Sequence, residues 1–171
     1  RMLCGPLDYT PGAMVNATRA SFFGNNDQPM SQGTRAHQVA MYTVFEAPLQ
    51  MFADSPSNYL ADAVCTRYMS RIPTFFDETV VLGGEMGEYV AIARRKGNFW
   101  YIAAMNNWDE KDLVLDLSQL KGLGTNASIL CDGVNAFKNG RDYKLEEKRI
   151  DPSGELNVHL APAGGWTAIV R

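Results

Sequence analysis

Two aspartates stand where predicted strands end, and their carboxylates are the side chains in this chain best suited to chemistry. Asp8 lies in the turn-rich segment Leu7–Gly12, and Asp54 opens the segment Asp54–Pro56. At the carboxyl ends of parallel barrel strands, such carboxylates face the mouth of the barrel, where they can accept hydrogen bonds from sugar hydroxyls. A structural alternative stays open: Asp8 caps its own turn and Asp54 caps the next helix. We assign both residues to substrate binding.

Other polar residues have weaker patterns. Arg35 and His37 lie near the start of a predicted helix, but a lone histidine in an apolar setting is typical of a hydrogen-bonded core residue. Asp77 and Glu78 form an adjacent acidic pair. Because successive residues of an extended chain point in opposite directions, these two do not form the two-carboxylate site of a glycosidase.

The cysteines and histidines do not form a metal-binding pattern. Cys4, Cys65 and Cys131 are far apart in apolar contexts, which favours buried free thiols over a disulfide or a metal site. His37 and His159 are also widely separated, so we expect no metal site formed within this chain.

The first half of the chain, up to about Phe76, begins with a strand, a loop and a helix. Arg1–Pro6 is a short apolar segment, predicted as a strand, and the polar loop Leu7–Gln28 follows it. Ser31 is the predicted N-cap of a helix that runs to about Phe45, with apolar residues at the helical period and Pro48 as its stop.

A second strand and helix follow. Leu49–Ala53 is predicted as a buried strand, and the helix from about Ser57 repeats apolar residues every four positions until Pro73 stops it. Strand–helix–strand–helix order with short connections implies parallel strands and a right-handed crossover. It fits either the last two units of a (β/α)8 barrel or the edge of an open α/β sheet.

From about residue 77 onward the sequence predicts strands only. The turn signals Lys96–Asn98 and Asp151–Gly154 separate short alternating runs, which favours an antiparallel β-sandwich. The predicted strands are Glu88–Arg94, Phe99–Met105, Leu113–Leu117, Ser128–Cys131, Tyr143–Arg149, Glu155–Leu160 and Trp166–Val170. The three tryptophans of this region, Trp100, Trp108 and Trp166, could stack on sugars if exposed, but core packing is the favoured interpretation.

Composition excludes several classes of partner. The chain has 171 residues, 46% of them hydrophobic and 20% charged, with a formal net charge of −3, which is ordinary for a globular protein. No basic cluster is long enough to predict nucleic-acid binding. No apolar run reaches the length of a membrane span, and the N-terminus has no signal-peptide pattern.

Several motifs together resemble the C-terminal part of glycoside hydrolase family 97 enzymes. They are collinear and dense as far as Arg95, whereas the remainder resembles the family more loosely. The motifs are Gly5-Pro-Leu-Asp-Tyr-Thr-Pro-Gly-Ala-Met14, Gln32-Gly-Thr-Arg-Ala-His-Gln-Val-Ala-Met-Tyr42, Ala47-Pro-Leu-Gln-Met-Phe-Ala-Asp-Ser-Pro-Ser-Asn-Tyr59, Phe76-Asp-Glu-Thr79 and Gly87-Glu-Tyr-Val-Ala-Ile-Ala-Arg-Arg95.

The resemblance implies a multidomain fold, α/β followed by all-β. Residues 1–78 would be the last two units of a (β/α)8 catalytic barrel, and residues 79–171 a C-terminal antiparallel β-sandwich. It also implies an exo-acting α-glycosidase that hydrolyses terminal α-linked glucose or galactose of oligosaccharides by paired carboxylates. Those acids, and the ligands of an active-site calcium ion, are expected upstream, so we assign no catalytic or metal-binding residue to this chain. Periplasmic localisation is implied by the resemblance alone.

Two further expectations complete the sequence interpretation. As a fragment without a catalytic acid and base, the chain should be inactive alone. It should also expose apolar side chains at Leu3 and Leu49–Phe52. Because burial of such side chains is favourable, we expect the chain to be stable only when bound to the remainder of the parent enzyme. The alternative function is a non-catalytic module, either a carbohydrate-binding sandwich that presents Trp100 and Trp166 to sugars, or a structural β domain that shields the barrel.

Overall fold

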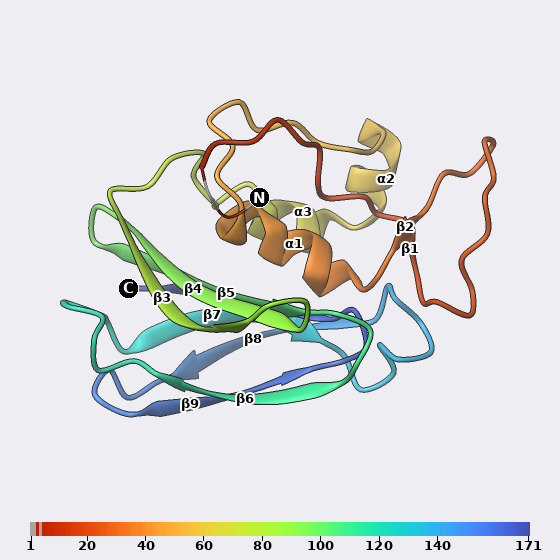
Figure 1. The fold of residues 1–171 in the computed structure, drawn as a ribbon. Helices are drawn as coiled ribbons and strands as arrows, with labels where there is room; N and C mark the ends of the chain where they lie inside the picture. Colours follow the sequence, from red (N-terminus) through yellow and green to blue (C-terminus); the bar gives the residue numbers. More distant parts are fainter. Residues whose placement is uncertain (1–2, 4) are drawn as a thin grey trace.

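A six-stranded antiparallel sheet divides the molecule, with two further strands on one face and helices on the other (Figure 1). The computed structural model describes residue 3 and residues 5–171. The sheet has the order β3–β4–β5–β10–β7–β8. These strands are β3 (Glu78–Glu85), β4 (Tyr89–Lys96), β5 (Phe99–Asn106), β7 (Asn126–Asp132), β8 (Tyr143–Arg149) and β10 (Gly165–Val170).

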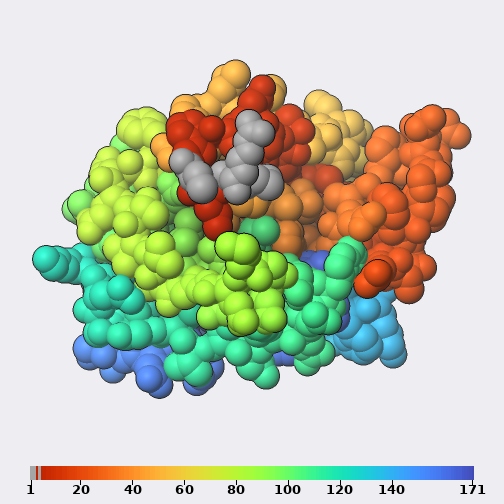
Figure 2. Space-filling view, viewed as in Figure 1, coloured from red at the N-terminus to blue at the C-terminus, as the bar shows by residue number. Residues whose placement is uncertain are grey.

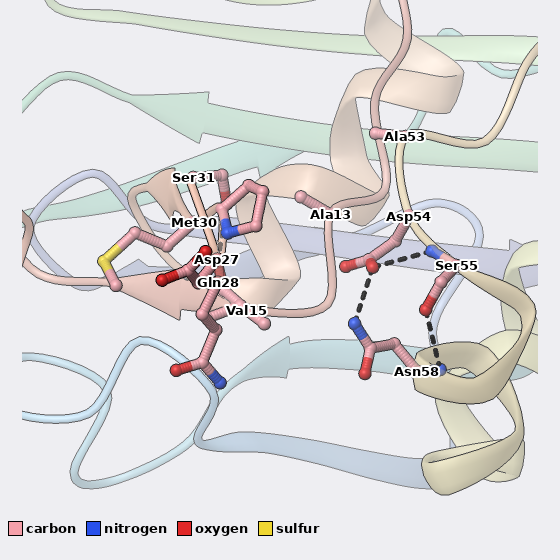
Figure 3. A pocket seen from close by; sticks show the side chains of 11 residues that line it. Ala13, Val15, Asp27, Gln28, Met30, Ser31, Ala53, Asp54, Ser55 and Asn58 are labelled. Carbon is pink, nitrogen blue, oxygen red and sulfur yellow. Dashed lines mark hydrogen bonds between the residues drawn. The ribbon is translucent and has the colours of Figure 1, made fainter. Parts of the chain in front are cut away.

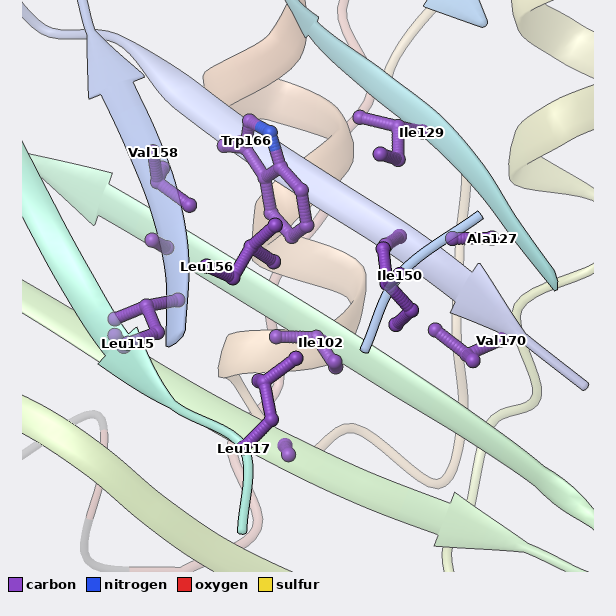
Figure 4. Close-up of a cluster of buried hydrophobic side chains, with 14 of the residues drawn as sticks. Ile102, Leu115, Leu117, Ala127, Ile129, Ile150, Leu156, Val158, Trp166 and Val170 are labelled. Carbon is purple, nitrogen blue, oxygen red and sulfur yellow. The ribbon is translucent and has the colours of Figure 1, made fainter. Parts of the chain in front are cut away.

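The second sheet, formed by β6 (Lys111–Asp116) and β9 (Glu155–Leu160), closes an antiparallel sandwich. Both strands alternate buried and exposed residues, because one face covers the core and the other meets solvent. Trp100 and Trp166 lie in the core between the sheets, and Figure 4 shows Trp166 among aliphatic side chains from both sheets. Core packing of these two tryptophans is therefore confirmed.

All seven strands expected beyond residue 77 are present, to within two residues at each end. The missed strand is β3. Its pairing with β4 shifts register between Val81 and Gly83, and such a bulge breaks the alternation on which strand prediction depends. Two glycines, Gly83 and Gly84, further weaken the signal, since glycine is unfavourable in a strand interior.

The other face of the large sheet is covered by α1 (Arg35–Val44), which packs on β4, β5 and β10. Thr34 is the N-cap, with its hydroxyl accepting a hydrogen bond from the His37 backbone N–H at 3.1 Å. The prediction of Ser31 as N-cap was wrong, because Ser31 belongs to β2 (Ser31–Gln32), a two-residue strand that pairs in parallel with β1 (Asn16–Ala17).

The backbone at the start of α1 is in direct contact with the backbone of the β domain (residues 79–171). At Gly165, a Cβ atom would lie 2.4 Å from the His37 backbone nitrogen, and at Gly140 it would lie 2.9 Å from the Gly33 carbonyl oxygen. The Arg35 backbone N–H donates to the Gly140 carbonyl at 2.6 Å. Only glycine permits these two approaches, so they fix how α1 sits on the sheet.

The second predicted helix is present as two shorter ones, α2 (Pro56–Ala61) and α3 (Ala63–Met69). Asp62 interrupts the helix with φ −126° and ψ 69°, and its carboxylate caps α3 by accepting from the Cys65 backbone N–H at 3.1 Å. The apolar four-residue repeat predicted the helical region correctly but not this break, because a cap inside a periodic run leaves the period unchanged.

Neither strand predicted in the first half is observed among the described residues. Leu49–Ala53 is irregular, and Leu3, Gly5 and Pro6 are not in a strand, whereas Arg1, Met2 and Cys4 lie outside the described residues. A parallel strand needs neighbouring strands to pair its backbone groups, and no described strand pairs with Leu49–Ala53. The expected apolar exposure is confirmed, since Leu49 is 74% exposed, Leu3 56% and Phe52 49%.

The two predicted parts share a core. Met14, Val39 and Tyr68 pack in one buried cluster with Tyr101, Leu130 and Ile169 of the large sheet.

The orange N-terminal loop and the pale-blue loop after β7 lie at the same end of the molecule (Figure 2). In the part of the chain that the structure describes, no helix is long and apolar enough to cross a membrane.

Candidate functional site

A cavity of about 670 Å³ opens beside Asp54, between the N-terminal loop and the start of α2 (Figure 3). This volume is typical of small-molecule sites. Carboxylate, hydroxyl and amide side chains share its wall with small apolar ones. The lining residues are Ala13, Val15, Asp27, Gln28, Pro29, Met30, Ser31, Ala53, Asp54, Ser55 and Asn58.

Asp54 is held by three hydrogen bonds. Its Oδ2 atom accepts from the Met14 backbone N–H at 2.7 Å, while Oδ1 accepts from the Ser55 backbone N–H at 2.7 Å and from the Asn58 amide at 2.6 Å. Burial opposes ionisation of Asp54, but these hydrogen bonds outweigh it and hold the pKa of the carboxyl below its usual value. Asp54 is therefore a fixed carboxylate with Oδ2 the less occupied oxygen.

The local sequence explains this placement. Ser55 is the N-cap of α2 and Pro56 its first residue, an arrangement that starts a helix directly after Asp54. Tyr59 in the same helix accepts a hydrogen bond from the Asp54 backbone N–H at 3.0 Å and donates its hydroxyl to the Gly12 carbonyl at 2.9 Å. The helix cap is thus Ser55, whereas Asp54 ties the N-terminal loop to the helix.

Asp8 has different surroundings. Its side chain is exposed, and it is not among the residues that line the Asp54 cavity. Its neighbour Tyr9 is anchored instead, donating its hydroxyl to the Met41 carbonyl at 2.8 Å and meeting the Phe45 ring edge to face at 5.3 Å. The structure therefore does not bring Asp8 and Asp54 together in one cavity.

Arg35 is a buried structural hub. Its Nη1 pairs with Asp62 Oδ2 at 2.6 Å, its Nε donates to Asn16 Oδ1 at 2.5 Å, and its Nη2 donates to the Met14 carbonyl. Asp62 also accepts the Tyr143 hydroxyl at 2.8 Å, which joins α1, α3 and β8. The sequence singled out Arg35 but not Asp62. Asp62 lies within the apolar repeat of the second predicted helix, and nothing in that repeat indicates an ion pair with a residue of another helix.

A second cavity, of about 300 Å³, lies beside Arg35 and shares Val15, Gln28 and Asn58 with the first. Asp62 and Arg141 also line it. The two cavities therefore form one polar region at the end of the molecule where α1 begins.

The remaining candidates are structural. His37 Nδ1 lies 2.8 Å from the Gly164 carbonyl, and burial lowers the pKa of its imidazole, which confirms a hydrogen-bonded histidine. Burial raises the pKa of the Cys65 thiol to about 12 and that of Cys131 to about 11. Both cysteines are free. Thiols that stay protonated are poor nucleophiles and poor metal ligands. Cys4 lies outside the described residues.

The acidic pair at residues 77 and 78 is divided between separate surface ion pairs. Asp77 Oδ1 lies 2.9 Å from Lys96 Nζ, and Glu78 Oε2 lies 2.8 Å from Arg95 Nε. Among the described residues no group of three or more His, Cys, Asp or Glu could hold a metal ion.

The comparison that decides the family is a family model. The model described as "Glycosyl-hydrolase 97 C-terminal, oligomerisation" matches residues 75–171, more than half of the chain. The chain belongs to glycoside hydrolase family 97. A solved structure agrees with this assignment. A family 97 enzyme from a Pseudoalteromonas species, in complex with acarbose, superposes on this chain with a TM-score of 0.85. The two sequences are 32% identical, and the match covers 99% of this chain and 27% of that one.

The similarity to curated proteins also covers the part of the chain before residue 75. A retaining alpha-galactosidase of Bacteroides thetaiotaomicron is 46% identical over all 171 residues, which are 26% of its length. A probable retaining alpha-galactosidase of Streptomyces bingchenggensis is 25% identical over 170 residues, 24% of its length. The chain thus spans about a quarter of the length of the curated relatives it matches.

Proposed function

We propose that this chain is the C-terminal part of an exo-acting, retaining α-galactosidase that removes terminal α-linked galactose from oligosaccharides. The observation that carries the proposal is the 46% identity, over all of this chain, to a protein named retaining alpha-galactosidase. The sequence alone left glucose and galactose equally open. The galactosidase relative, which is more similar to this chain than the acarbose-bound enzyme is, favours galactose.

The catalytic carboxylates belong to the upstream part of the proposed enzyme. A retaining glycosidase needs a nucleophile and an acid/base carboxyl about 5–5.5 Å apart across the glycosidic bond. The carboxylates described above have other partners: Asp62 pairs with Arg35, Asp77 with Lys96 and Glu78 with Arg95. A calcium ion would likewise take its ligands from outside the described residues, and a periplasmic location remains part of the proposal.

In this proposal residues 1–78 complete a (β/α)8 barrel, and residues 79–171 cover its outside. The exposed apolar run Leu49–Phe52 would become the last barrel strand once neighbouring strands are present. The N-terminus of α1 and the start of α2 would then mark the catalytic end of the barrel. Asp54 would accept a substrate hydroxyl through Oδ2. A substrate-binding role for Asp8 rests on the sequence pattern alone, because its neighbours Leu7 and Tyr9 contact the other end of α1.

The alternative of a carbohydrate-binding module is less favoured. A sugar-binding sheet face requires exposed aromatic rings, whereas Trp100 and Trp166 are 1% and 5% exposed. The buried cluster that α1 shares with the large sheet favours a structural role for residues 79–171.

The test is hydrolysis by the full-length parent. We expect release of p-nitrophenol from the α-galactoside and not from the α-glucoside, with the α-anomer of galactose as the first product in a proton NMR time course. Loss of activity on chelation, with recovery on adding calcium, would support the metal. Release from the glucoside alone, or an inverted first product, would overturn the proposed specificity or mechanism.

A further inference from the structure

A loop of the β domain reaches the end of the molecule where the candidate site lies. The segment 133–142, between β7 and β8, is organised by Asp142, whose carboxylate accepts from the Asn135 backbone N–H at 2.8 Å. The Gly133 backbone N–H donates to the Asp142 carbonyl at 3.1 Å, which closes the loop. The loop is therefore an ordered structure, fastened to α1 through Gly140.

Arg141 follows this contact directly and lines the second cavity. In Figure 3 the Gln28 amide extends from the first cavity toward the pale-blue chain of the β domain, and Gln28 and Arg141 line the second cavity together. The Arg141 side chain is exposed, whereas the other arginine of that cavity, Arg35, is buried in its ion pair with Asp62. Arg141 therefore supplies the cavity with an accessible guanidinium.

The chemistry of the lining selects the kind of ligand. Gln28 and Asn58 offer amides, and Asp54 and Asp62 offer carboxylates. In the second cavity the Asp62 carboxylate is already paired with Arg35, so the groups left for a ligand are the amides and the Arg141 guanidinium. These are hydrogen-bond donors that suit the hydroxyl oxygens of a neutral sugar, the ligand class that the proposed function supplies. A guanidinium presents several donors in a fixed plane and can bind two neighbouring hydroxyl oxygens.

We propose that Arg141 is a specificity-determining residue that binds the sugar next to the terminal galactose, on the leaving-group side. The proposal rests on the proposed function and extends it, since it gives the β domain a direct contact with substrate. The first cavity, at Asp54, then lies toward the terminal sugar and the second toward the remainder of the oligosaccharide.

The test compares two substrates of the full-length parent. Raffinose carries further sugars beyond its terminal galactose, whereas p-nitrophenyl α-galactoside does not. We expect Arg141→Ala to raise KM for raffinose about tenfold, in line with loss of a charge-assisted hydrogen bond, and to leave kcat and KM for the aryl substrate unchanged. Arg141→Lys, which keeps the charge but loses the planar fork, should lie between.

The matched control is Lys138→Ala. Lys138 lies in the same loop, and its ammonium lies 5.0 Å from the centre of the Phe137 ring, outside the second cavity. We expect it to change neither substrate's kinetics. Unchanged raffinose kinetics in Arg141→Ala, or equal losses on both substrates, would overturn the role of Arg141. A wild-type parent that cleaves neither substrate would instead overturn the proposed function, and this inference with it.

Discussion

At the scale of single residues, the network around Asp54 is where sequence and structure meet most closely. The sequence singled out this carboxylate, and the structure gives it three donors, from Met14, Ser55 and Asn58. Two of these donors, from Ser55 and Asn58, belong to the start of α2, which directly follows Asp54 in the sequence. The third comes from the N-terminal loop, far from Asp54 along the chain, which no local pattern could have predicted.

We expect Asp54→Asn to destabilise the chain by about 1–3 kcal/mol, because an amide NH₂ replaces an acceptor that faces hydrogen-bond donors. The lowered pKa adds a pH dependence. Ionised Asp54 contributes stability above its usual pKa of 3.8, and this contribution is lost as pH falls through the lower folded-state value. Urea unfolding between pH 7 and pH 3 measures both effects.

The control is Asp8→Asn, which removes the same charge from an exposed side chain. We expect it to leave the free energy of unfolding at pH 7 within about 0.5 kcal/mol of wild type, as for most surface substitutions. If the two variants had equal stability, Asp54 would not anchor the N-terminal loop.

At the scale of elements, prediction succeeded where a segment carries its own pairing signal. Strands β4 and β5 each contain a continuous apolar run, and the turn residues Gly97 and Asn98 join them, so the hairpin is readable from the sequence. Leu49–Ala53 carries a strand composition without a described partner, and composition alone does not form a strand. The break between α2 and α3 was missed because Asp62 caps within an unbroken apolar period.

Helix α1 is the element that joins the two halves, and His37 reports on its attachment. Because burial lowers the pKa of His37, the unfolded chain binds this proton more readily than the folded chain. Stability due to His37 is therefore complete above the ordinary pKa of 6.5 and falls as pH drops below it. We expect His37→Gln to flatten the stability profile between pH 7 and pH 5, measured by urea unfolding.

The other histidine provides the comparison. His159 is exposed, on β9, so His159→Gln should leave the decline due to His37 in place. If His37→Gln left the pH dependence of the free energy of unfolding unchanged, a group other than His37 would account for the difference in proton binding between the folded and unfolded chains.

At the scale of the whole molecule, the sandwich has one face that solvent should not reach. Tyr101, Leu130 and Ile169 on the large sheet are buried against residues 14–69. Burial of each such side chain is worth about 1.5–3 kcal/mol. The sequence predicted a boundary at residue 78, but a boundary in the chain does not imply two separate cores.

We therefore expect residues 79–171, expressed alone, to be markedly less stable than residues 1–171 and to self-associate. Size-exclusion chromatography and urea unfolding of the two lengths make the comparison. A monomeric excised domain with the stability of the longer chain would contradict the shared core. The separate expectation, that residues 1–171 are stable only with the rest of the enzyme, is tested by the same measurements on the longer length.

The close glycine contacts at Gly140 and Gly165 constrain how this part of the enzyme can be recombined. A Cβ atom at either glycine would clash with backbone atoms of residues 33–37, at the start of α1. A chimera that takes its β domain from one family member and its helices from another must therefore match main-chain positions, and not only side chains, on both sides of this contact. Residues 33–37, 140 and 165 should be exchanged together, as one inherited block.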